Sequence, residues 1–162
     1  MENGSMITGA SLADAVLDSA REVFDSMIFI PIEPNDPAPV AAGEAALLAT
    51  ITFTGEVKGC FGLCLDQPGA RAVAAAMLCM DDTEDLTEND VIDAVGEIAN
   101  MVMGGIKTRL QENVRDLEIS IPSVIQGRDL VNRPGEGSEY VAIPVTIGGQ
   151  YPAELSLLYR PR

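Results

Sequence analysis

The chain has 162 residues, 47% of them hydrophobic, which is enough for one domain with a packed core or for two fused half-size repeats. Its 25 acidic residues against 10 basic ones give a net charge of −15, which repels phosphate backbones and argues against a nucleic-acid partner. No apolar run reaches the ~18 residues that a membrane span needs. Since the polar N-terminus also lacks a signal pattern, the sequence predicts a soluble, cytoplasmic protein.

The first predicted element is a helix from Ser11 to Met27, with Ser11 as its N-cap. Its apolar stripe comprises Leu12, Val16, Ala20, Val23 and Met27. The β-rich run 27–32 predicts a strand that Pro34 stops. The Pro- and Ala-rich stretch 33–43 predicts a loop.

A β-hairpin and a second helix follow this loop. The strands Ala46–Thr54 and Val57–Leu65 are joined around Gly55, which is typical of a hairpin turn. Pro68 then opens a helix, because its fixed φ suits the first helical turn. The apolar residues of that helix are Ala70, Val73, Ala74 and Met77.

The longest predicted helix begins after Thr87, its N-cap, and reaches about Gln111. Leu117–Ile121 predicts a strand that Pro122 ends. The stretch 126–138 is rich in glycine and proline and predicts a mobile loop.

A second β-hairpin is predicted near the C-terminus, with strands Tyr140–Ile147 and Tyr151–Tyr159. Gly148 and Gly149 form its turn. It matches the first hairpin weakly, with Thr52, Gly55 and Leu63 falling on Thr146, Gly149 and Leu157.

The two halves of the chain share this order of elements. Four of the eight residues 14–21 are identical to those of residues 93–100. We therefore predict two degenerate repeats, about 9–66 and 87–160, within a single domain that spans residues 1–162. The predicted fold class is α+β, with long helices packed on an antiparallel β-sheet in a pseudo-two-fold, duplicated domain.

The chain contains no histidine, which removes the commonest general base and the commonest transition-metal ligand. Cys60 and Cys64 lie four residues apart in a strand-like run, or about 13 Å, which is too far for a disulfide. We expect these two and Cys79 to be small buried residues in a reducing compartment. Without histidine, a cysteine pair also lacks the partners for a zinc site.

The long helix carries the strongest indication of function, because its polar residues gather on one face. At about 100° per residue, Asp93, Glu97, Asn100 and Gly104 fall within about 60° of one another. The opposite face comprises Val91, Val95, Ile98, Val102, Ile106 and Arg109. A carboxylate and a carboxamide one turn apart thus stand on a rigid support.

Asn100 and the pair Gly104–Gly105 are unfavourable inside a helix, where each glycine costs roughly 1 kcal/mol relative to alanine. Close approach of a partner would explain the glycines, and so would tight packing against another helix. In the first predicted helix, Arg21 occupies the position of Asn100 and Asp18 that of Glu97.

The densest acidic stretch lies just before this helix. It contains Asp81, Asp82, Glu84, Asp85, Glu88 and Asp90. One interpretation is a solvated loop whose acids favour a helix N-terminus. The other is a field that steers a basic protein surface towards the helix.

At these residues the chain resembles the CheC/CheX family of chemotaxis phosphatases. The family signature is an Asp or Ser, three residues, Glu, two residues, Asn, and a Pro some two dozen positions later. It falls here on Asp93, Glu97, Asn100 and Pro122, with the proline one position earlier than in the family pattern. CheC-like members carry two such motifs. The single intact motif here is more similar to the CheX branch, whose members pair as dimers through their sheets.

The resemblance implies hydrolysis of the aspartyl phosphate on a CheY-like response regulator. The receiver domain would bring its own Mg²⁺ and lysine, so the resemblance implies no metal site and no cofactor in this chain. The remaining task is to place a water in line with the phosphorus. Asn100 would orient that water, and Glu97 would pair with the receiver lysine. Asp93 and Gly104 would contact the partner. The resemblance also implies a homodimer.

A competing hypothesis is a non-catalytic binding or scaffold module, like relatives of this fold in the flagellar switch. In that case the helix recognises the phosphorylated regulator and Asn100 is incidental. The in-phase pair of Glu97 and Asn100 favours the phosphatase. A small-molecule enzyme is disfavoured, since no glycine-rich phosphate loop follows a strand and no nucleophile–base pair is visible.

Overall fold

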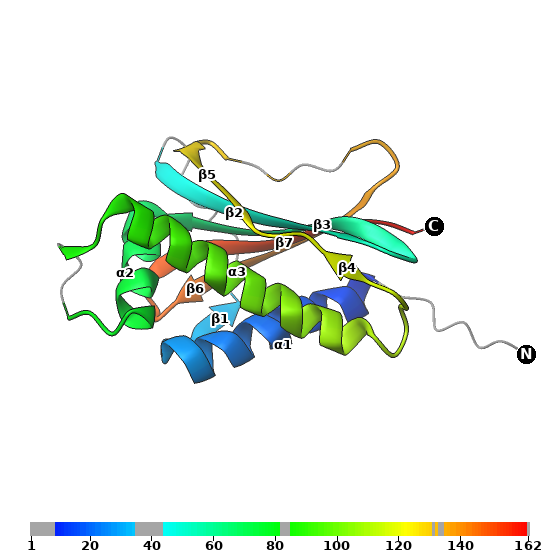
Figure 1. The fold of residues 1–162 in the computed structure, drawn as a ribbon, viewed down its shortest axis with the longest axis horizontal. Coiled ribbons are helices and arrows are strands. Elements are labelled where there is room, and N and C mark those ends of the chain that lie inside the picture. Colours follow the sequence, from blue (N-terminus) through cyan, green and yellow to red (C-terminus); the bar gives the residue numbers. More distant parts are fainter. Residues whose placement is uncertain (1–8, 35–43, 82–84, 131, 133–134, 162) are drawn as a thin grey trace, which may run out of the picture.

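The computed structural model describes residues 9–34, 44–81, 85–130, 132 and 135–161. In these ranges helices cover one face of a seven-stranded antiparallel sheet (Figure 1). The predicted α+β class, with helices packed on an antiparallel sheet, is confirmed. Among the helices described, none is long and apolar enough to cross a membrane.

Helix α1 (Gly9–Val23) begins before its predicted start, so Ser11 lies inside the helix and is not its N-cap. The predicted stripe is buried at Leu12, Val16, Ala20 and Val23. The chain then continues as a π-helical turn, η1 (Phe24–Ile28). Because this wider turn shifts the residues around the axis, Ile28 is buried and Met27 is 53% exposed, contrary to prediction.

The predicted strand 27–32 is wrong, because the helical turn continues to Ile28 and Phe29 takes a left-handed φ of 61°. Strand β1 (Ile32–Pro34) starts where the predicted strand ends. It lies at the edge of the sheet and pairs with β6 (Glu139–Ile147). An edge strand tolerates Pro34, which has no N–H to donate. Residues 35–43 of the predicted loop lie outside the described residues.

The hairpin of β2 (Ala45–Thr54) and β3 (Val57–Asp66) is confirmed. At its turn Gly55 has a φ of 155°. A Cβ added there would lie 2.8 Å from the carbonyl oxygen of Asp116, so the turn requires glycine.

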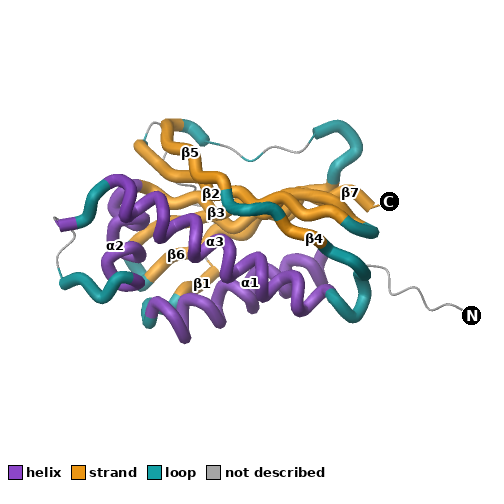
Figure 2. Tube along the Cα trace, in the orientation of Figure 1, coloured by secondary structure: helices purple, strands orange, loops and turns teal. Residues whose placement is uncertain are grey.

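Helix α2 (Gln67–Met77) has Pro68 in its first turn, as predicted, and Asp66 as its N-cap. The sequence of Asp66-Gln67-Pro68 thus combines a capping carboxylate with a residue preset for the helical φ. Figure 2 shows α2 at the end of the helical layer, next to the start of the longest helix.

Helix α3 (Glu88–Leu110) is the longest helix, and its predicted N-cap is confirmed. Thr87 and Asp90 form a capping box, in which each side chain accepts from the other residue's backbone N–H. The exposed Asp81 and Asp85 lie before this cap and Glu88 and Asp90 lie in the first turn of α3, whereas Asp82 and Glu84 lie outside the described residues. Helices α1 and α3 lie side by side on the sheet (Figure 2).

The strand predicted at Leu117–Ile121 is shorter than expected and ends before Pro122, and the sequence did not predict the second strand that begins after this proline. Both β4 (Glu118–Ile119) and β5 (Ser123–Arg128) pair with β2, on either side of the proline. Residues 126–128 therefore belong to a strand, although the sequence predicts a loop from residue 126. The edge of β2 supplies hydrogen-bond partners that no local pattern indicates.

The second hairpin joins β6 to β7 (Tyr151–Pro161) and is confirmed. Gly148 and Gly149 have φ values of 60° and 67° within the three-residue connection 148–150, a left-handed conformation that glycine adopts without a steric cost. The described part of the chain thus contains two hairpins whose inner strands, β3 and β7, pair at the centre of the sheet.

The strand order is β1-β6-β7-β3-β2-β4, with β5 also paired to β2. If β1 is exchanged with β4 and β5, β6 with β2, and β7 with β3, the same order results, read from the opposite edge of the sheet. Each hairpin is therefore flanked by a short strand from the other half of the chain. This symmetry agrees with a duplication into repeats 9–66 and 87–160, which stays a prediction.

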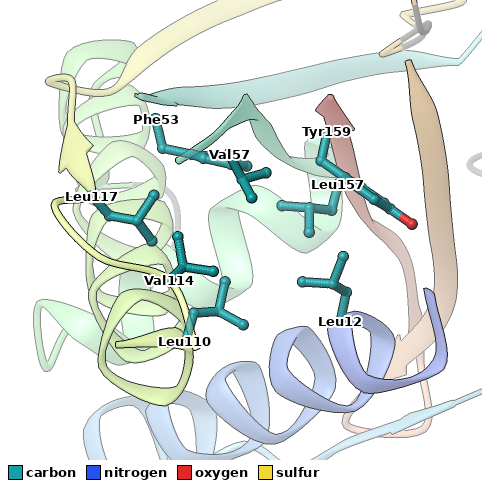
Figure 3. A pocket seen from close by; sticks show the side chains of 8 residues that line it. All are labelled: Leu12, Phe53, Val57, Leu110, Val114, Leu117, Leu157 and Tyr159. Carbon is teal, nitrogen blue, oxygen red and sulfur yellow. The ribbon is translucent and has the colours of Figure 1, made fainter. Parts of the chain in front are cut away.

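A small apolar cavity remains at the end of the core between α1, α3 and the sheet (Figure 3). It is lined by Leu12, Phe53, Val57, Leu110, Val114, Leu117, Leu157 and Tyr159. These side chains offer almost no polar group to orient a ligand, so the cavity is a feature of core packing.

The three cysteines are free thiols in different surroundings. Cys64 is buried and Cys60 is half-buried, but Cys79 is exposed, so the prediction of three buried cysteines is wrong there. Cys79 follows α2 in a left-handed conformation with a φ of 55°, and the next residue, Met80, packs against the core.

Candidate functional site

The predicted polar face of α3 forms one flank of this helix. Asp93 and Glu97 are exposed, and Asn100 and Gly104 are half-buried. The other face is buried at Val91, Val95, Ile98, Val102 and Ile106. The capping box and the packed apolar face hold the helix in place, so the polar side chains project from a rigid support.

The polar side chains of this face are free to bind a partner. Within the described ranges, Asp93, Glu97 and Asn100 make no side-chain hydrogen bond or ion pair. A carboxamide both donates and accepts, whereas a carboxylate accepts from cations and N–H groups. The face can therefore orient a small polar molecule and pair with a positive charge.

A groove runs along this face between α3 and the β4–β5 segment. It is lined by Ile92, Asp93, Gly96, Glu97, Pro122 and Val124. Pro122 is distant in sequence from the helix, yet it shares the groove with the two carboxylates. The fourth residue of the predicted signature is thus brought next to the first two.

Sequence reasoning did not identify Gly96 as part of this site. A Cβ added to Gly96 would lie 3.4 Å from Cγ2 of Val124 and 3.6 Å from Cγ of Pro122, which are ordinary contacts. The groove floor at this point is therefore the helix backbone itself. A glycine inside a helix was the available signal, but only the pairing of β5 with β2 brings Val124 to it.

The structure separates the roles of the two neighbouring glycines. A Cβ added to Gly105 would lie 3.1 Å from Cβ of Ser19 on α1, so this glycine serves close helix packing. A Cβ added to Gly104 would meet nothing within 4 Å. Packing therefore explains Gly105 only, and Gly104 stays a candidate contact for a partner.

Arg109, the polar member of the apolar face, joins α3 to α1. Its Nη1 donates to Oγ of Ser19 at 3.1 Å, and its Nη2 lies 2.6 Å from a carboxylate oxygen of Glu22. Oγ of the buried Ser19 in turn donates to the carbonyl oxygen of Ala15. Arg109 thus has a structural role and does not belong to the polar face.

The face of α1 that corresponds to the polar face of α3 has no asparagine at the position of Asn100. Arg21 stands at that position and pairs with Glu33 on β1 at 3.5 Å, with both side chains well exposed.

Within the described residues, no group of three or more His, Cys, Asp or Glu side chains is arranged to hold a metal ion.

Known proteins resemble this chain in sequence and in fold. A family model described as chemotaxis phosphatase CheX matches residues 47–146, more than half of the chain. The CheY-P phosphatase CheX of Thermotoga maritima is 27% identical over 123 residues, which cover 75% of this chain and 79% of that protein.

Two solved structures show the similarity of the fold. The crystal structure of the chemotaxis protein CheX from Vibrio vulnificus gives a TM-score of 0.77 at 25% identity and covers 95% of this chain and 99% of that one. CheX in a complex with CheY, BeF₃ and Mg²⁺ from Borrelia burgdorferi gives a TM-score of 0.71 at 23% identity. That match covers 91% of this chain and 96% of that one.

Proposed function

Because the chain belongs to the chemotaxis phosphatase CheX family, we propose that it hydrolyses the aspartyl phosphate of a CheY-like receiver domain. One observation carries the assignment of residues. Glu97 and Asn100 lie in phase on one flank of α3, without partners among the described residues. The name of the Thermotoga relative and the composition of the Borrelia complex support the choice of partner.

Asn100 is proposed to position the attacking water. An aspartyl phosphate is already activated, so the reaction needs a water held in line with the phosphorus more than it needs a nucleophile from this chain. The amide oxygen of Asn100 accepts a hydrogen bond from that water, and the side chain does not titrate. Because Asn100 is half-buried on α3, its side chain has fewer rotamers in the free protein, so less side-chain entropy is lost on binding.

Glu97 is proposed to dock the receiver by pairing with a lysine. It lines the groove together with Asp93 and Pro122, so the receiver would cover the groove as well as the helix. The metal ion would belong to the receiver, as the composition of the Borrelia complex allows. Asp93 and Gly104 would then contact the partner one turn on either side of the Glu97–Asn100 pair.

The test is the rate of phosphate loss from phosphorylated receiver domains of the same organism. Asn100→Ala should slow this rate by at least about a hundredfold, because the water loses its position. The free energy of unfolding should change by no more than about 0.5 kcal/mol, since Asn100 makes no hydrogen bond to the described residues.

Two variants serve as controls for Asn100. Asn89→Ala removes an exposed amide from the first turn of α3, and Arg21→Ala changes the matching position on α1; both should keep the wild-type rate. Full activity of Asn100→Ala would refute the mechanism. If the wild type binds the phosphorylated receiver without hydrolysing it, the chain is a binding or scaffold module.

A further inference from the structure

A second groove lies on the face of the sheet away from the helices. It is lined by Thr52, Phe53, Thr54, Lys58, Gly59, Ser138 and Arg160. Thr52 and Thr54 are exposed, whereas their neighbours Ile51 and Phe53 are buried in the core that the helices cover. Since successive side chains on a strand point to opposite faces, the two threonines project from the uncovered face.

The lining contains two cations and no carboxylate. Lys58 on β3 and Arg160 on β7 are direct cross-strand partners, and both are exposed. Like charges in this arrangement repel each other. Within the described part of the chain neither forms an ion pair, and Arg160 donates to the backbone carbonyl oxygen of Glu136.

This local charge is opposite to that of the whole protein. The chain has 25 acidic residues and 10 basic ones, yet two of the basic side chains meet in a lining that contains no carboxylate. The exposed Glu118 lies opposite Thr54 on β4 and, within the described residues, forms an ion pair with neither cation. The remaining polar groups are the hydroxyls of Thr52, Thr54 and Ser138, which can donate to an anion without carrying charge. An oxyanion in the groove would relieve the repulsion between the cations.

We propose that this groove binds a small dianion, a phosphate or a dicarboxylate, between Lys58 and Arg160. The Arg160 guanidinium offers paired N–H donors and Lys58 a compact positive charge, and charge-assisted hydrogen bonds of this kind are the strong ones. The groove shares no residue with the groove beside Glu97. The proposal is therefore independent of the phosphatase assignment.

The experiment titrates ¹⁵N-labelled protein separately with inorganic phosphate and with succinate, while chloride is adjusted to keep ionic strength constant. The amides of Thr54 and Gly59 should shift along a saturable curve with at least one of the two anions, and the stronger response identifies the ligand class. The double variant Lys58→Gln/Arg160→Gln should bind about tenfold more weakly or worse, because both charge-assisted contacts are lost.

The charge-matched control is Lys107→Gln/Arg115→Gln, which removes two positive charges outside the groove. It should keep the wild-type affinity, and its amide spectrum reports whether the fold is intact. Equal weakening in both double variants would show an effect of net charge alone and would overturn the proposal. Non-saturating shifts with both anions in the wild type would overturn it as well.

Discussion

Glu97 is an exposed carboxylate without an ion pair among the described residues, so its charge is available for docking. Glu97→Gln should weaken affinity for the phosphorylated receiver, because the variant keeps the shape and loses the charge. It should also reduce the salt dependence of association, since a charge pair across an interface is screened by salt. Calorimetric titration at low and high salt measures both effects.

The matched control for this prediction is Glu112→Gln, an equal loss of charge at an exposed residue beyond the end of α3. Its affinity and salt dependence should stay close to those of the wild type. Affinity of Glu97→Gln that equals the wild type at both salt concentrations would exclude the docking role.

Cys64 makes the stability of the protein sensitive to alkali. Burial raises the pKa of its thiol to about 11, and the nearby carboxylates of Glu154 and Asp66 add to the shift. The unfolded chain releases this proton near the ordinary pKa of 9.0, while the folded chain retains it. The free energy of unfolding should therefore be fully retained below about pH 9 and fall as the pH rises towards 11.

Urea denaturation at a series of pH values from 8 to about 10.5 measures this slope. Cys64→Ala should flatten the decline, because the group that remains protonated only in the folded state is gone. Cys79→Ala serves as the control, since it removes a thiol from an exposed position. An unchanged slope for Cys64→Ala would contradict the prediction.

At the scale of the elements, Gly104 and Gly105 form a matched pair within α3. Gly104→Ala should stabilise the protein by up to about 1 kcal/mol, because the added methyl meets no atom and alanine favours the helix. Gly105→Ala should give no such gain, because its methyl would lie 3.1 Å from Cβ of Ser19. Chemical denaturation of both variants compares these effects.

The same pair tests the role of Gly104 in partner binding. If the receiver approaches the helix closely at Gly104, alanine there should slow dephosphorylation although the fold is more stable. Wild-type turnover of a stabilised Gly104→Ala variant would remove Gly104 from the site.

At the scale of the molecule, the two edges of the sheet differ. The β1 edge has three residues and ends in Pro34, which cannot donate to another strand. The β5 edge is longer and exposes Ile125 by 49%. An exposed apolar edge strand is a template for pairing with another chain, so we predict a homodimer joined at the β5 edge.

Light scattering at micromolar concentration should give the mass of a dimer. Ile125→Lys should give a monomer, because a charged residue on an edge strand opposes pairing. Leu78→Lys, which changes an apolar residue of similar exposure (45%) after α2, should remain dimeric. A monomeric wild type would refute the prediction.

Short-range interactions made several elements predictable from the sequence. The cap at Thr87 and the turn at Gly148 and Gly149 depend on residues at most three positions apart, so their signals lie within a few letters of the chain. The placement of Glu97 and Asn100 on one face follows from the period of a helix alone. For the same reason the polar face of the candidate site was recognisable before the fold was known.

Tertiary structure decided whatever depends on distant neighbours. Pro122 ends a strand in the local pattern, but the free edge of β2 pairs with the chain on both sides of it. Gly104 and Gly105 are equivalent in sequence and differ because only Gly105 faces α1. The groove beside Glu97 exists because residues of β5 pack on Gly96, and the cations Lys58 and Arg160 meet because β3 pairs with β7. Contacts between residues far apart in the chain depend on which elements pack together, which the local pattern of the sequence does not determine.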